Sequence, residues 1–161
     1  MDHWNKTEDY IQILIDSLKK KSLLLTNLTQ KNALQEAAVM SDDTQAFDHI
    51  LEEKAVLIEE LNHLDQGFDL VFEQVKGEIE KNPSEFKKQI REMQNLIREI
   101  TDKSLGVQSQ EKKNKELIEK QFRKMRQEIQ GRRTSVKAAT NYYKSMNSLS
   151  YDASSSIDKK K

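Results

Sequence analysis

Apolar residues recur every three or four positions along most of the chain, which is the spacing of one face of an α-helix. The first such stripe predicts a helix from about Asn5 to Val39, and its members are Ile11, Leu14, Leu18, Leu25 and Leu28. Short polar side chains at 41–43 then end this helix and supply a cap for the next one.

The clearest pattern lies between Asp43 and Glu80, where a heptad repeat predicts a second helix. Its a and d positions are Phe47, Ile50, Lys54, Leu57, Leu61, Leu64, Phe68, Val71 and Val75. Lys54 is the charged member, and we expect its stem to lie along the core while its ammonium reaches water. Fixing the helix register or binding an acidic group of a partner are the alternatives for Lys54.

A third helix is predicted to begin near Pro83, because proline disfavours helical backbone in the preceding residue and fits the first turn of a new helix. Its stripe comprises Phe86, Ile90, Met93, Ile97, Ile100 and Val107. The stripe fades between Gln108 and Glu116 and resumes out of phase at Phe122, which predicts a stutter rather than an end of the helix. Gly131 is the expected soft point of this helix.

Three single-stripe helices with short breaks predict an all-α fold, an elongated antiparallel helical bundle or coiled coil. We expect the bundle to span residues 1–133 and a separate amphipathic, flexible segment to span residues 134–161. Residues 36–80 carry 13 acidic and two basic side chains, whereas residues 111–133 carry four acidic and nine basic ones. The acidic second helix is therefore expected to lie between its more basic neighbours.

Composition narrows the class of protein further. Apolar residues make up 35% of the chain and charged residues 34%, which is typical of long, thin helices rather than a thick globular core. The chain has no cysteine, so a disulfide framework, a thiolate nucleophile and a cysteine-based zinc site are excluded. Neither a signal peptide nor a membrane span is expected, because no long apolar run is present.

Nucleic-acid binding is not expected, because Phe122 is the single aromatic residue in the basic block and falls on the apolar stripe. Glu60 and His63 form one half-motif of a helical di-metal site, but a second copy is missing. His49 and His63 share heptad position c and should face water. No glycine-rich loop or nucleophile constellation is present, so no catalytic residue, cofactor site or metal site is predicted.

The C-terminal segment is again amphipathic. Its stripe comprises Val136, Ala139, Tyr143 and Met146, with Tyr142, Leu149 and Tyr151 beside it. A short helix of this kind is marginal alone and becomes stable by packing on a partner. We therefore predict that these seven residues bind a partner, and the alternative is an ordinary helix that completes the bundle.

Two stretches resemble the FlgN-like flagellar export chaperones of bacteria. They are LIDSLKKKSLLLTNL, residues 14–28, and SDDTQAFDHILEEKAVLIEELNHLD, residues 41–65, and the resemblance covers roughly the first 75 residues well. It implies a small cytoplasmic helical chaperone that is not an enzyme. Such a protein binds the C-terminal helical segments of hook-associated (hook-filament junction) proteins and delivers them to the flagellar type III export gate.

Two alternatives stay open beside that resemblance. One is a FliT-like chaperone, which serves the filament-cap protein. The other is a structural coiled-coil adaptor or homodimer that carries no cargo.

Overall fold

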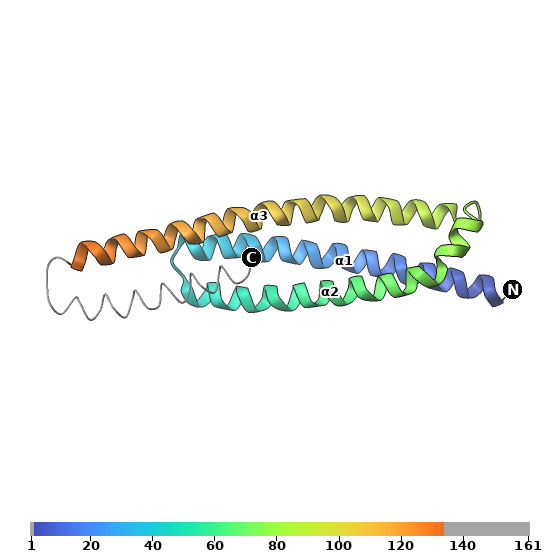
Figure 1. The fold of residues 1–161 in the computed structure, drawn as a ribbon, viewed down its shortest axis with the longest axis horizontal. Helices are drawn as coiled ribbons and strands as arrows, with labels where there is room; N and C mark the ends of the chain where they lie inside the picture. The colour runs from blue at the N-terminus through green and yellow to red at the C-terminus, as the bar shows by residue number, and fades with distance from the viewer. Residues whose placement is uncertain (1, 134–161) are drawn as a thin grey trace.

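Three long helices make up the part of the chain that the computed structural model describes, which is residues 2–133, with side chains described for residues 6–130. They are α1 (Asp2–Met40), α2 (Thr44–Lys81) and α3 (Lys87–Arg133), and Figure 1 shows them as one elongated bundle. The predicted all-α fold of three long packed helices is confirmed. None of these three helices is long and apolar enough to cross a membrane.

The central helix is α1. It packs against both of its neighbours, and no Cα atom of α2 lies within 8 Å of a Cα atom of α3 (Figure 1). α1 and α3 run parallel, and α2 runs antiparallel to both. The expectation that the acidic helix lies in the middle is therefore wrong, because α1 is the helix with buried apolar side chains on two sides.

The core cluster likewise takes most of its residues from α1 and α3 and only one from α2. Its buried members are Ile11, Leu14, Ile15, Leu18, Leu25 and Leu28 from α1, Val75 from α2, Phe86 from the turn before α3, and Met93, Ile100 and Val107 from α3. Most of the α2 stripe is only half-buried, and the buried residues of this helix are Ile50, Lys54 and Val75. The regular heptads of α2 are thus only partly covered by the rest of the bundle.

The two breaks differ in their local structure. Asp43 caps α2, because its side chain accepts a hydrogen bond of 3.0 Å from the backbone N–H of Ala46. At the other break Pro83 does not open a helix. Residues 83–86 form a turn in which the Glu85 N–H donates to the Asn82 carbonyl at 3.1 Å, and α3 begins only at Lys87. The turn places Phe86 in the core, and the predicted start of this helix was four residues early.

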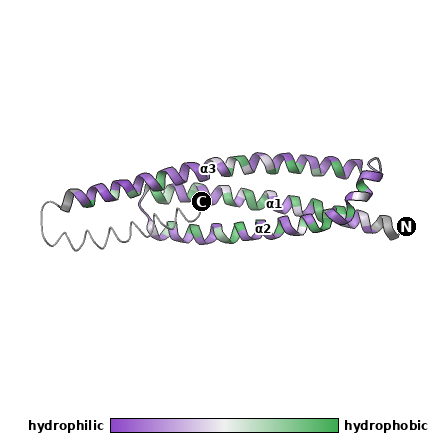
Figure 2. Cartoon of the chain, in the orientation of Figure 1, coloured by the Kyte–Doolittle hydropathy of each residue, from purple (hydrophilic) through white to green (hydrophobic). Residues whose placement is uncertain are grey.

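α3 continues without interruption through the polar stretch and through Gly131 to Arg133. Met93, Ile100 and Val107 are followed at the same interval of seven residues by Asn114, which is only 2% exposed. The next buried residue, Ile129, lies 15 residues further on, one position out of this repeat, which agrees with the predicted stutter. Figure 2 shows the C-terminal half of α3 as mostly hydrophilic. The stripe therefore continues there through a polar residue rather than through an apolar one.

Candidate partner-binding surface

A buried polar layer joins all three helices at Lys54. The Lys54 ammonium donates to Gln35 Oε1 of α1 at 3.0 Å and forms an ion pair of 2.7 Å with Glu111 Oε1 of α3. The side chain of Lys54 is 7% exposed and that of Glu111 is 43% exposed. The ammonium thus binds protein groups instead of reaching water, so this arrangement favours the register role over simple packing of the stem.

Amide side chains extend the same layer. Asn114 Nδ2 donates to the Asn32 carbonyl at 2.9 Å and to Gln35 Oε1 at 3.1 Å. Asn32 Nδ2 in turn donates to Gln110 Oε1 at 3.3 Å. Each bond requires one relative height of the helices, and a shift by one turn breaks the whole set. The layer is a structural device that aligns the bundle.

Ion pairs show which helices the acidic block faces. Lys21 and Lys31 of α1 pair with Asp65 and Glu53 of α2, the first pair at 2.7 Å. The basic block of α3 contributes a pair between Lys113 and a glutamate of α1 at 2.9 Å. The acidic block thus meets the basic block through Glu36 of α1, whereas α2 itself has no Cα atom within 8 Å of one in α3.

Glu53 provides a test of this α1–α2 contact by pH. A hydrogen bond from Lys31, together with the charges of Lys31 and His49, lowers the pKa of Glu53 below its usual value of 4.5, against an opposing effect of burial. Stability from this carboxylate is therefore present above the unfolded-state pKa and is lost as the pH falls through the lower folded-state value. We expect Glu53→Gln to be less stable than the wild type at neutral pH, and urea unfolding should show the gap closing in acid. A gap independent of pH would contradict the ion pairing.

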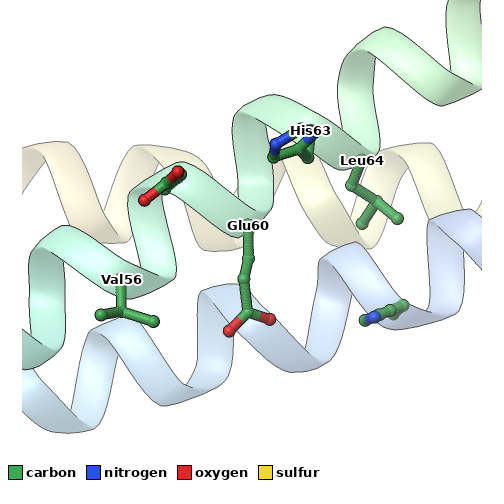
Figure 3. A pocket seen from close by; sticks show the side chains of 6 residues that line it. Val56, Glu60, His63 and Leu64 are labelled. Carbon is green, nitrogen blue, oxygen red and sulfur yellow. The ribbon is translucent and has the colours of Figure 1, made fainter.

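The described surface has a shallow hollow beside α1 and α2, with a volume of about 420 Å³. Lys20, Val56, Glu59, Glu60, His63 and Leu64 line it. Figure 3 shows that Glu60 and His63 extend in different directions from α2. Among the described residues no group of three or more His, Cys, Asp or Glu side chains is placed to hold a metal ion. His49 and His63 are exposed, as predicted.

A strip of incompletely covered apolar side chains follows the facing sides of α2 and α3. Leu61, Phe68 and Phe72 of α2 and Ile90 of α3 are half-buried against the core, and the rings of Phe68 and Phe72 stack at 6.1 Å. Ile58 and Ile97 continue the same helix faces and are 45% and 46% exposed. We name these residues the α2–α3 seam, and its members are Ile58, Leu61, Phe68, Phe72, Ile90 and Ile97.

The sequence matches the FlgN protein family over residues 1–148. The chain belongs to this family. FlgN proteins are cytoplasmic flagellar export chaperones for hook-associated proteins, and they are not enzymes. No curated protein sequence and no solved structure matches the chain. The resemblance noted for the first half of the sequence thus holds for nearly all of it.

The seven predicted partner-binding residues of this FlgN protein all lie outside the described residues. They are Val136, Ala139, Tyr142, Tyr143, Met146, Leu149 and Tyr151. The α2–α3 seam, by contrast, was not predicted as a surface. Leu61, Phe68, Ile90 and Ile97 were assigned to apolar stripes from their spacing, and Ile58 and Phe72 were assigned to none. Spacing shows that a stripe needs a partner and does not show how fully the partner covers it.

Proposed function

We propose that this FlgN chaperone captures the C-terminal helical segments of hook-associated proteins through its own residues 134–161. The stripe from Val136 to Tyr151 contacts the cargo segment, and the bundle of residues 1–133 is the scaffold to which this stripe is attached. The chaperone then brings the bound segment to the flagellar export gate. It acts on proteins alone, without a nucleic-acid partner.

The character of the stripe supports this assignment. A helix of about four turns is marginal in water when nothing covers its apolar face. Tyr142 and Tyr143 offer large contact areas with few rotatable bonds, and Met146 adapts to irregular partners. The match to the FlgN family extends to residue 148, so it includes the first five residues of the predicted contact.

Deleting residues 134–161 tests the proposal. The truncated chain should keep the helical circular dichroism of the bundle, because the described core cluster is built by residues between Ile11 and Val107. Its Kd for a C-terminal peptide of a hook-associated protein, measured by calorimetry, should rise at least tenfold, which corresponds to about 1.4 kcal/mol. The matched control ends the chain after Tyr151 and should bind like the full chain. An unchanged Kd for the larger deletion would remove this segment from the mechanism.

A symmetric homodimer is the competing explanation for the same stripe. In that case two copies cover each other through identical patches, and no apolar surface is left for cargo. Sedimentation at several protein concentrations separates the two, since the capture proposal requires a stripe that stays accessible in the free chaperone.

A further inference from the structure

We propose that the α2–α3 seam is a second docking strip, and that its occupant is an amphipathic helix of the cargo with basic residues beside its apolar face. The inference rests on the proposed chaperone function and adds a site within the bundle. The heptad pattern of α2 and the burial of its side chains do not match. α2 has the most regular heptads of the chain, yet only three of its residues are buried.

The contact between Lys54 and Glu111 sets the relative height of α2 and α3. Because the two helices are antiparallel, 14 residues along each of them from this contact bring Phe68 opposite Ile97. Two further contacts agree, since neighbouring residues of α1, Lys21 and Ser22, bind Asp65 of α2 and Glu99 of α3. Phe68 of α2 and Ile97 of α3 therefore lie at the same level, over the same part of α1, and Ile58 lies ten residues along α2 from that level.

The backbones of α2 and α3 do not touch at this level. Cα atoms of α2 and α3 stay more than 8 Å apart along these two helices. Ile58 and Ile97 remain almost half exposed on the facing sides. A helix that brings anchors at intervals of three and four residues fits such a strip, as in other helix-in-groove complexes. The stacked pair Phe68 and Phe72 offers it a flat aromatic surface.

Residues 134–161 would not reach Ile97 as a single helix folded back along α3. From Ile97 to the end of α3 at Arg133 there are 36 residues, or about 54 Å of helix. The 28 residues from 134 to 161 would span about 42 Å as one continuous helix. Folded back along α3, such a helix would pass the level of Ile58, about 39 Å from Arg133, and would end short of Ile97. The proposed occupant therefore concerns the part of the seam around Phe68 and Ile97, which residues 134–161 would leave uncovered.

The charge of the residues around the seam indicates which kind of helix can bind there. Residues 36–80 carry a net charge of −11, and Asp69 and Glu73 are exposed beside Phe72. The neighbouring positions of α3, Gln94 and Thr101, are uncharged. A second copy docked symmetrically by this strip would bring two acidic helices together, which like-charge repulsion opposes. A cargo helix with lysine or arginine along one edge meets no such cost.

Single substitutions of exposed seam residues test the proposal in the full chain. Ile97→Lys and Ile58→Lys should each raise the Kd of the cargo peptide about tenfold, since each places a charge where the apolar face docks. Matched controls are Leu105→Lys on α3 and Leu70→Lys on α2, which add the same charge at residues 58% and 70% exposed. Both controls should bind like the wild type. The probe is a synthetic peptide with the C-terminal helical sequence of a hook-associated protein, and a version with its basic residues changed to glutamate should bind more weakly.

The outcomes separate the two proposals. Wild-type affinity in both seam variants, with affinity lost on deletion of residues 134–161, overturns the seam and leaves the proposed function standing. Weaker binding by the seam variants with no effect of the deletion supports the seam and overturns the role of the C-terminal segment. A seam variant that dissociates a dimer in sedimentation while peptide affinity stays constant assigns the strip to a second copy and overturns the proposal.

Discussion

Replacing Phe86 with alanine is expected to lower the free energy of unfolding by about 3–5 kcal/mol, the largest effect of any single substitution considered for this chain. The ring is 1% exposed and belongs to the core cluster together with Val75, Ile11 and Leu14. It sits in the turn before α3, where residues 83–86 are not helical. The substitution therefore removes both the buried area and the anchor that holds this turn against the core.

Urea unfolding followed by circular dichroism measures this effect. Leu70→Ala is the matched control, because Leu70 is 70% exposed and its truncation should change stability by less than about 0.5 kcal/mol. Phe86→Leu should lie between the two, since it keeps part of the buried area. A loss of under about 1 kcal/mol in Phe86→Ala would mean that the turn closes over the cavity, and that Phe86 does not anchor it.

The helices themselves followed from the sequence, because a period of three to four residues and short polar breaks are local properties. Which helix lies between the other two did not follow from the sequence. The complementary charge blocks suggested that α2 is the central helix, yet a helix in the middle needs buried side chains on two sides. α1 provides them, since Ile15 and Leu24 are buried beside the stripe that begins at Ile11. Such burial becomes visible only when the neighbours are in place.

The polar stretch of α3 was misjudged for a related reason. From its hydropathy Asn114 is expected to face water. In the structure its side chain is buried, and its amide donates hydrogen bonds to Asn32 and Gln35 across the helix interface. A polar group at a core position is stable when every bond is made, and sequence alone shows the group without its partners. The seam was missed for the opposite reason, because apolar spacing says nothing about the size of the covering surface.

Removing the Glu111 carboxylate should destabilise the bundle by about 2–3 kcal/mol, whereas replacing Lys54 with methionine should change its stability by less than about 1 kcal/mol. Glu111→Ala leaves a buried ammonium with Gln35 as its remaining partner in the layer. Lys54→Met removes that charge and keeps a similar volume. Gln35 Oε1 still accepts from Asn114 at 3.1 Å, and the half-exposed Glu111 carboxylate returns to water.

A double-mutant cycle tests whether the effects of the two substitutions depend on each other. In the Lys54→Met background, Glu111→Ala should cost little, because no buried charge is left without a partner. Urea unfolding of the wild type, both single variants and the double variant gives the coupling energy directly. If the two effects simply add, the ion pair does not hold the ammonium in the core.

The same variants test the register role of the layer. A single polar residue at a core position fixes helix alignment at some cost in stability. Lys54→Met should therefore keep or raise the midpoint of unfolding while admitting shifted or intermolecular pairings of α2, which sedimentation detects as added dimer. A Lys54→Met protein that is as monomeric as the wild type would leave alignment to the amides of Asn32, Gln35 and Asn114. In that case the lysine is tolerated by the layer rather than required by it.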